Sequence, residues 1–301
     1  MVNAFSALST IAALISVVCS VPAPHPKYWF AFGDSYSATG FNVTTGPFPN
    51  LANPFGNPAY PGYTACGIFT NYIDDLTAVN NKSLIFTYNF AYGGATINAT
   101  LVTPYLPTVL SLGDQVDEYL NSVASRPAST PWTPENSLFS FFIGINDIGN
   151  SWYQAGSRTA FNNVLLDNYF ALVQKVYNTG ARNFLFINVP PVDRSPLMLA
   201  EPAASQAGEK TVINEFNLQL AARVAKFDLS QKGVKALYYD SHTRVTEILD
   251  NPTKYGFIDN TTYGTDATDY CWCNNYHISP GVHSYLAKDI SELFALTLTP
   301  F

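Results

Sequence analysis

Five short and almost uninterrupted apolar runs recur along this chain of 301 residues, and they constrain its fold more than any other feature. We predict strands at residues 28–32, 84–88, 138–143, 184–189 and 236–239. Continuous apolar runs, rather than alternating ones, are typical of a sheet that is covered on both faces. Helical periodicity follows at residues 163–178, 212–227 and 282–296. This alternation predicts an α/β fold, a three-layer α/β/α sandwich with a central parallel sheet of about five strands.

The first 20 residues differ in character from the rest of the chain, and we interpret them as a secretory signal peptide. Residues 11–18 form an apolar run too short to span a bilayer, and small residues at positions 18–23 offer cleavage sites. An N-terminal helix of the fold is the alternative interpretation. No repeat or linker divides the remaining chain, so we expect residues 21–301 to form a single domain.

Four sequons of the form Asn-X-Ser/Thr are consistent with a protein that is exported from the cell. They begin at Asn42, Asn81, Asn98 and Asn260, and each is a candidate for N-glycosylation. We therefore expect a secreted, extracellular protein.

Cysteine usage limits the cross-links of an exported chain. Removal of the signal peptide takes Cys19 with it and leaves Cys66, Cys271 and Cys273, which allow at most one internal disulfide. Cys271 and Cys273 would point the same way on an extended segment, so a direct bridge between them would be strained. We expect Cys66 to pair with one of the two. Three scattered thiols and four histidines do not favour a structural zinc site.

The charge of the chain argues against two classes of partner. Charged residues make up only 12% of the chain, the net charge is −7, and no run of lysine or arginine occurs. Such a chain is a poor candidate for binding nucleic acid or anionic lipid. No second long apolar run follows the N-terminal one, so we expect no stable insertion into a membrane.

The first predicted strand ends in a turn that holds a candidate nucleophile. Residues 28–32 include four aromatic side chains and run directly into Gly33-Asp34-Ser35. In open α/β sheets, ligands bind outside the carboxyl ends of the strands, which is where this turn would place Ser35. We expect Asp34 to be a structural hydrogen-bonding residue of the turn.

A long loop over residues 39–64 follows Ser35 directly and is rich in Gly, Pro, Asn and aromatic residues. Loops of this length without periodicity are usually functional, so we expect it to form a wall of the cleft. Phe48, Phe55, Tyr60 and Tyr63 are its candidate stacking surfaces for a ligand. The alternative is a glycosylated loop that only packs against the domain.

Three later segments supply groups that could meet Ser35 at the same edge of the sheet. Asn89-Phe-Ala-Tyr-Gly-Gly94 follows the second predicted strand, and a glycine there lets a backbone N–H approach a ligand closely. Phe141-Phe-Ile-Gly-Ile-Asn-Asp147 ends the third strand and brings an amide side chain to that edge. Asn274-Asn-Tyr-His277 lies in a turn-rich stretch before the last predicted helix. A hydroxyl, an imidazole and N–H donors are the groups that nucleophilic acyl transfer requires.

In this order, the four segments resemble the GDSL, or SGNH, hydrolase superfamily, and the resemblance extends over essentially the whole mature chain. Fungal-type secreted members grouped as family 16 carbohydrate esterases are the most similar. The resemblance implies a flavodoxin-like SGNH fold with Ser35 as the nucleophile and His277 as the general base. It also implies an oxyanion hole formed by the backbone N–H groups of Ser35 and Gly94 and by the side-chain amide of Asn146. It implies neither a metal nor a cofactor.

Two positions depart from the family pattern. The family has Asp three residues before the catalytic histidine and Pro directly after it, where this chain has Asn274 and Ile278. The amide oxygen of Asn274 can accept the imidazole N–H, but it brings no negative charge to the imidazolium. Three outcomes stay open: orientation of His277 by Asn274 or a main-chain carbonyl, an acid recruited from Asp266 or Asp269, or an impaired enzyme. We favour the first.

Other histidines and acids fit the chemistry less well. His283, six residues beyond His277, is an alternative base. We expect Asp147 to be a turn or helix-capping residue, and His25 and His242 to lie at the surface.

We therefore expect a monomeric, secreted serine esterase that removes acetyl groups from carbohydrates such as acetylated xylo-oligosaccharides. One alternative is a GDSL lipase or phospholipase-like acylhydrolase with a wider apolar cleft. The other is a catalytically impaired carbohydrate-binding protein, which the Asn274 exchange keeps open.

Overall fold

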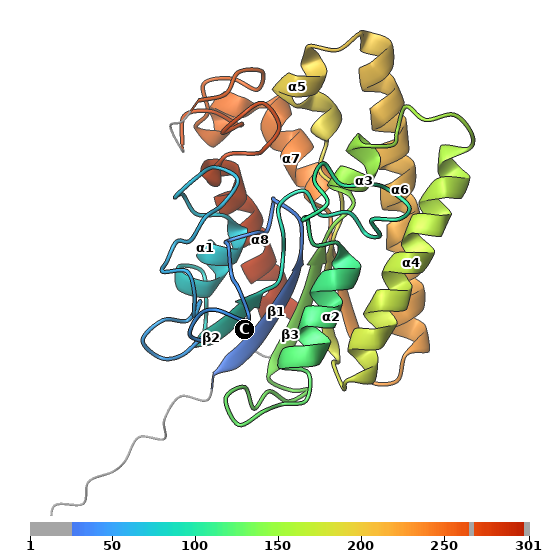
Figure 1. Cartoon of the computed structure of the whole chain (residues 1–301). Coiled ribbons are helices and arrows are strands. Elements are labelled where there is room, and N and C mark those ends of the chain that lie inside the picture. Colours follow the sequence, from blue (N-terminus) through green and yellow to red (C-terminus); the bar gives the residue numbers. More distant parts are fainter. Residues whose placement is uncertain (1–25, 265–267, 298–301) are drawn as a thin grey trace, which may run out of the picture.

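Five parallel strands form the centre of the computed structural model, which describes residues 26–264 and 268–297 (Figure 1). Their order across the sheet is β2-β1-β3-β4-β5. The strands are β1 (Lys27–Gly33), β2 (Ile85–Asn89), β3 (Ser137–Phe142), β4 (Asn183–Ile187) and β5 (Lys235–Tyr239). All five predicted strands are confirmed to within two residues, and the strand order is that of flavodoxin-like folds.

Aromatic side chains at paired positions of neighbouring central strands stack on one another. Phe30 and Phe32 of β1 lie opposite Phe139 and Phe141 of β3, and the ring centroids of both pairs are 4.9 Å apart. Phe141 in turn stacks on a phenylalanine of β4 at 5.6 Å. All of these rings are fully buried. Cross-strand aromatic pairs of this kind stabilise a sheet beyond the area they bury, which is why the continuous aromatic runs become central strands.

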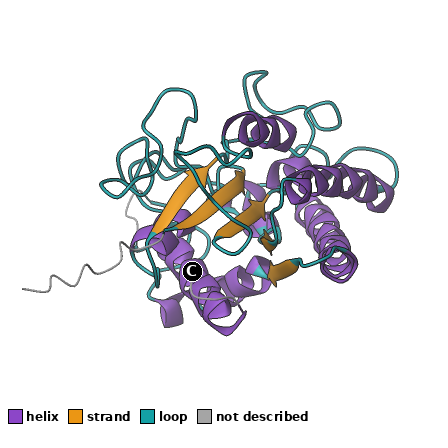
Figure 2. Cartoon of the chain, turned by 90° about the horizontal axis from the view of Figure 1, so that it is seen from below, coloured by secondary structure: helices purple, strands orange, loops and turns teal. Residues whose placement is uncertain are grey.

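Helices cover both faces of the sheet (Figure 2). On one face lie α1 (Tyr72–Ala78), α7 (Ser241–Asp250) and α8 (Pro280–Thr297), and on the other lie α2 (Leu112–Ser122), α4 (Arg158–Asn178) and α6 (Ala203–Ser230). Short elements complete the described chain: α3 (Ile145–Gly149), α5 (Pro196–Leu199) and the 3-10 turns η1 (Val192–Arg194) and η2 (Pro252–Tyr255). The expected three-layer α/β/α sandwich is confirmed. None of the helices in the described ranges is both long enough and apolar enough to cross a membrane.

The helices differ from the sequence prediction mainly at their starts. The structure begins α4 at Arg158 and α6 at Ala203, five and nine residues earlier than predicted. The side chain of Ser157 accepts a hydrogen bond from Ala160 N and so caps α4 before its apolar periodicity begins. The helices α1, α2 and α7 were not predicted. They are seven, eleven and ten residues long.

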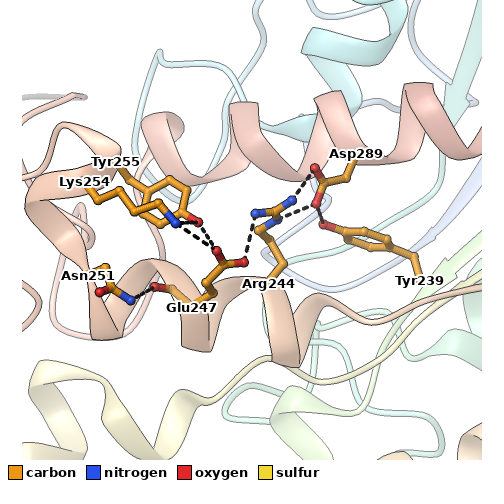
Figure 3. Close-up of polar contacts among 7 residues, drawn as sticks. All are labelled: Tyr239, Arg244, Glu247, Asn251, Lys254, Tyr255 and Asp289. Carbon is orange, nitrogen blue, oxygen red and sulfur yellow. Dashed lines mark hydrogen bonds and ion pairs between the residues drawn. The ribbon is translucent and has the colours of Figure 1, made fainter.

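A polar network centred on Asp289 joins the C-terminal helices (Figure 3). Arg244 of α7 forms a bidentate ion pair with Asp289 of α8, with N···O distances of 2.5 and 2.8 Å. The hydroxyl of Tyr239, at the end of β5, donates to the same carboxylate at 2.9 Å. One turn further along α7, Glu247 accepts a hydrogen bond from Tyr255 of η2. Paired charge-assisted hydrogen bonds are among the stronger polar contacts, and here they hold α7 against the helix that follows the His277 loop.

Candidate active site

The Ser35 turn lies where the sheet's connections reverse direction. The chain leaves β1 for β2 on one side and returns to β3 on the other, so the carboxyl end of β1 is a topological switch point. Gly33 ends β1 with no space for a side chain, because a Cβ there would lie 2.4 Å from the carbonyl oxygen of Phe142. Asp34 accepts a hydrogen bond from Tyr36 N at 3.0 Å, which is the structural role expected for it. Ser35 stands half-buried at the head of this turn.

The structure brings Ser35, His277 and Asn274 into one chain of hydrogen bonds. The Nε2 atom of His277 lies 2.7 Å from Ser35 Oγ, although the two residues are 242 positions apart. On the other side of the ring, Nδ1 lies 2.9 Å from Asn274 Oδ1. The three side chains lie in the order that a nucleophile, a base and an orienting group take in serine hydrolases, with an amide in the place of the usual carboxylate.

The Asn274 amide fixes the tautomer of the imidazole. Its oxygen accepts the backbone N–H groups of Tyr276 and His277, each at 2.9 Å, and its nitrogen donates to the carbonyl of Ala65 at 3.2 Å. A flipped amide would face two N–H donors with its own NH₂ group, so the oxygen must point towards the ring. His277 Nδ1 therefore carries the proton, and Nε2 is left as the acceptor for the Ser35 hydroxyl.

The loop that carries His277 is tied to three separate parts of the domain. Cys273 forms a disulfide with Cys66, which confirms the expected pairing of Cys66 and settles its partner, whereas Cys271 is free and buried. The hydroxyl of Tyr36, next to Ser35, donates to the carbonyl of Tyr276 at 2.6 Å. The backbone N–H of Leu197, in α5, donates to the carbonyl of Asn275 at 2.7 Å. These ties give the imidazole a fixed approach to Ser35.

Burial keeps His277 neutral. Removal of the ring from solvent lowers the pKa of His277 to about 4, and no carboxylate of residues 26–264 or 268–297 raises it again. A neutral imidazole at pH 7 is the form that can accept a proton from Ser35. The histidine is therefore in its basic form over most of the acidic range.

The candidate oxyanion donors follow three neighbouring strands of the sheet. Within residues 26–264 and 268–297, no acceptor is hydrogen-bonded to the backbone N–H of Ser35 or Gly94. Gly94 has a φ of +82°, and a Cβ there would lie 2.2 Å from the ring of Tyr105, so only glycine fits. Asn146, in the first turn of α3, donates one amide N–H to Ala95 O at 3.0 Å, which leaves its second N–H available. The three donors lie after β1, β2 and β3, at one edge of the sheet.

Asp147 contacts the loop that carries the candidate oxyanion donor Gly94. Its two carboxylate oxygens lie 3.0 and 3.1 Å from Ile97 N, so it holds the loop that carries Gly94, and α3 has no side-chain cap. Burial raises the pKa of Asp147 to about 7 and that of Asp34 to about 8, and the proximity of the two carboxyls adds to the effect on Asp34. The sequence interpretation of Asp147 as a turn or cap residue missed this long-range contact, because no local pattern identifies Ile97 as the partner.

None of the other candidate histidines and acids in the described part of the chain is hydrogen-bonded to Ser35. His283 is buried and stacks on Tyr72 with ring centroids 6.1 Å apart, and it forms no hydrogen bond with Ser35. His242 is half-buried rather than at the surface, because α7 packs it against the domain. Asp269 makes no contact with His277 within the described part of the chain. Residues Asp266 and His25, and the proposed signal peptide at 1–20, lie outside the described residues.

A cleft of about 390 Å³ opens at Ser35. Both ends of the 39–64 loop line it, through residues such as Phe41 and Tyr63, so the loop does form a wall. Three of its four candidate stacking rings were assigned wrongly, because Phe48, Phe55 and Tyr60 do not line the cleft. Phe48 packs against Tyr88 at 5.7 Å, and Phe55 is buried beneath Tyr60 at 5.4 Å.

Of the four candidate rings, only Tyr63 faces the cleft, and the sequence analysis missed a second ring, that of Tyr92, on the β2 side. Nothing in the local pattern distinguishes Tyr92 from a buried aromatic residue. A larger cavity of about 590 Å³ lies elsewhere, between α1 and α8, and neither Ser35 nor His277 lines it.

The four sequon asparagines differ in their contacts. The amide nitrogens of Asn81, Asn98 and Asn260 all donate hydrogen bonds to the protein, that of Asn260 at 2.6 Å to Leu249 O. Asn42 is exposed at the rim of the Ser35 cleft, and its amide nitrogen has no partner among the described residues.

Comparison with known proteins reveals relatives across nearly the whole chain. The family model for GDSL-like lipase/acylhydrolase matches residues 30–290. An acetylesterase of Thermothelomyces thermophilus is 40% identical over 267 residues, which cover 88% of this chain and 87% of that protein. GDSL esterase/lipase 3 of Arabidopsis thaliana is 24% identical, over 86% of this chain and 84% of that protein.

Solved structures share the fold at low sequence identity. An acetylxylan esterase from Geobacillus stearothermophilus superposes with a TM-score of 0.50 at 14% identity, over 88% of this chain and 93% of that one. The aryl esterase of M. smegmatis gives a TM-score of 0.50 at 15% identity, over 90% and 100%.

Proposed function

This chain belongs to the GDSL-like lipase/acylhydrolase family and is a carboxylic ester hydrolase, and we propose that it is a secreted serine acetylesterase acting on acetylated oligosaccharides. The observation that carries the proposed mechanism is the 2.7 Å contact between His277 Nε2 and Ser35 Oγ, with the ring held in the required tautomer. Acetylated xylo-oligosaccharides are the proposed substrates.

The reaction would proceed through an acyl-enzyme. Ser35 Oγ attacks the ester carbonyl while its proton passes to His277 Nε2, and the resulting imidazolium returns that proton to the leaving sugar hydroxyl as the C–O bond breaks. A water molecule then gives its proton to the same nitrogen and attacks the acetyl carbonyl carbon. As the bond between that carbon and Ser35 Oγ breaks, the imidazolium returns the proton to Oγ, which releases acetate and regenerates Ser35. At both tetrahedral stages, the negative oxygen would lie between the N–H groups of Ser35, Gly94 and Asn146.

Asn274 would serve as the orienting group in this mechanism. Exchange of Asp for Asn costs about 10⁴ in turnover in another serine hydrolase, mainly because the imidazole takes the wrong tautomer. That cause does not apply here, since two main-chain N–H groups and the Ala65 carbonyl hold the amide oxygen towards Nδ1. The amide carbonyl dipole would stabilise the transient imidazolium less than a carboxylate does. We therefore propose an active enzyme rather than an impaired one.

Support for the acetyl substrate comes from the size of the cleft and from the 40% identical acetylesterase. A volume of about 390 Å³ lies near the small end of the 300–1,000 Å³ range typical of ligand pockets. A short acyl group on a small sugar suits that space better than a long acyl chain does.

Three measurements test the proposal. Acetate release from acetylated xylo-oligosaccharides, and hydrolysis of p-nitrophenyl esters of increasing chain length, should both be lost in Ser35→Ala, with the fastest p-nitrophenyl hydrolysis on acetate. A fluorophosphonate probe should label the wild type at Ser35. Preference for long acyl chains would indicate a lipase instead, and absence of labelling together with sugar binding would indicate a binding protein.

Secretion and glycosylation belong to the same proposal. Expression of the full chain in a fungal secretory host should yield extracellular protein whose N-terminus lies near residue 21. Peptide mapping should find Asn42 occupied most fully, because its side chain is exposed and its amide nitrogen makes no hydrogen bond with the described residues, and Asn260 least. Intracellular retention with an intact N-terminus would contradict this part of the proposal.

A further inference from the structure

The cleft at Ser35 is lined without charge. Its lining residues are small, aromatic, hydroxyl-bearing or amide-bearing, and they include Tyr63 and Tyr92. None of these carries a formal charge, so nothing in the lining would pair with a uronate or a phosphate group, and a charged ligand would lose hydration without compensation. Hydroxyl and amide groups among the lining can donate and accept hydrogen bonds. The chemistry of the cleft therefore suits a neutral, hydroxyl-rich ligand.

Two tyrosine rings of the lining have no aromatic or hydrogen-bonding partner among the residues that the structure describes. The side chains of Tyr63 and Tyr92 are 67% and 39% exposed, and among the described residues neither ring stacks on another aromatic and neither hydroxyl is hydrogen-bonded. Tyr60, in the same loop as Tyr63, is different, because it packs on Phe55 and does not line the cleft. An aromatic ring that stays open to solvent beside a nucleophile is available to a ligand.

Both tyrosines are held in place by the segment that carries Ser35. Tyr63 N donates to Thr39 O at 2.9 Å, and Tyr92 N donates to Gly33 O at 3.1 Å. These acceptors lie four residues after and two residues before Ser35. The main chain at both tyrosines is therefore fixed relative to the nucleophile. A sugar that stacks on the two tyrosine rings would cost the protein little conformational entropy.

We propose that Tyr63 and Tyr92 form the subsite that binds the sugar ring of the acetylated saccharide beside Ser35. The rings would contact the apolar C–H face of a neutral pyranose, and the tyrosine hydroxyls would hydrogen-bond to its edge. This inference rests on the proposed function and deepens it, because it assigns the leaving-group side of the cleft to two residues. It also excludes uronic acids and phospholipid head groups as preferred leaving groups.

The experiment compares a saccharide with an ester that has no sugar. For each variant, kcat/KM is measured on acetylated xylotriose and on p-nitrophenyl acetate, and the ratio of the two is formed. Tyr63→Ala and Tyr92→Ala should each lower this ratio about 2- to 10-fold, mainly through a higher KM for the saccharide. Tyr63→Phe and Tyr92→Phe should retain most of it, because the ring remains. Tyr153→Ala removes a tyrosine that is 64% exposed but does not line the cleft, and it should leave the ratio unchanged.

A binding measurement removes catalysis from the comparison. In a Ser35→Ala background, acetylated xylotriose should bind with a measurable Kd in calorimetry, and adding Tyr63→Ala or Tyr92→Ala should raise that Kd by a similar factor. An unchanged ratio and Kd would overturn the proposal. So would a loss that falls on p-nitrophenyl esters of long acids, since the rings would then bind the acyl chain.

Failure of the proposed function gives a different result. In that case the wild type would hydrolyse p-nitrophenyl acetate through Ser35 but would release no acetate from any acetylated saccharide. That outcome would refute both the proposed saccharide substrate and the proposed tyrosine subsite. If the wild type cleaves the saccharide and the tyrosine variants retain the ratio, only the proposed subsite is refuted.

Discussion

Asn274→Asp is the substitution that most directly tests how this site differs from a Ser-His-Asp triad. Burial alone lowers the pKa of His277 to about 4, and the group at Nδ1 is a neutral amide oxygen 2.9 Å away. A carboxylate at that distance favours the imidazolium, and an opposite charge this close shifts a pKa by about 1–3 units. We therefore expect the variant's histidine to titrate between about pH 5 and pH 7.

The sign of the effect on activity follows from the form that reacts. The base must be neutral, so kcat/KM falls as pH drops through the pKa of the free enzyme. At pH 5, about nine-tenths of the wild-type histidine is neutral, whereas with a pKa of about 6 only about a tenth is. Relative to its own plateau, the variant should thus lose about ten-fold at pH 5. The same substitution removes the donor to Ala65 O and should cost about 1–3 kcal/mol of unfolding free energy.

The assay is acetate release, followed chromatographically, from about pH 3.5 to about pH 8 for wild type, Asn274→Asp and Asn274→Ala. Asn274→Ala is the control, because it removes the orienting oxygen without adding charge. It should lower kcat at every pH and leave the acid limb in place. An acid limb near pH 6.5 in the wild type, or an identical limb in Asn274→Asp, would refute the reasoning from burial and charge.

Three further predictions concern the groups around this pair. Asn146→Ala should lower kcat about 10²–10³-fold, with a thermal melting curve close to that of the wild type, as measured by circular dichroism; a loss below ten-fold would remove it from the oxyanion hole. Cys66→Ser combined with Cys273→Ser should cost about 2–5 kcal/mol in urea unfolding, because the bridge spans 207 positions, and kcat should fall as the His277 loop loosens; unchanged kcat would show that the other ties suffice. Asp34 and Asp147 have pKa values raised by burial to about 8 and about 7, so they favour the folded state while protonated, and that stability is lost as pH rises through these values. Since the buried histidines are neutral in both states above pH 6.5, Tm should fall between about pH 6.5 and about pH 8.5, and it should fall less in Asp147→Asn; a rising Tm would contradict the sign.

Local patterns were sufficient for the sheet and for the chemical groups at its edge. Continuous apolar runs identify strands covered on both faces, whatever their partners, and each candidate group follows one of those runs or precedes the last helix. The positions at which helices begin were harder to predict from the sequence. The helix α1 begins with a capping box at Asn71, yet its buried face includes Asp74 and Asp75, so its pattern does not look amphipathic. The resemblance to a family, rather than periodicity, assigned the roles of Ser35 and His277.

By itself, the sequence determined that the strands are buried, that a serine turn ends the first of them, and that amide, glycine and histidine segments follow in order. Only the tertiary structure decided which atoms meet. It set the direction of the Asn274 amide through Ala65, gave Asp147 its contact with Ile97, and left Tyr63 and Tyr92 open while Phe55 turned inward. The physical reason is that a strand or a turn depends on neighbours in the chain, whereas a hydrogen bond or an exposed ring depends on segments that lie as much as 242 residues away.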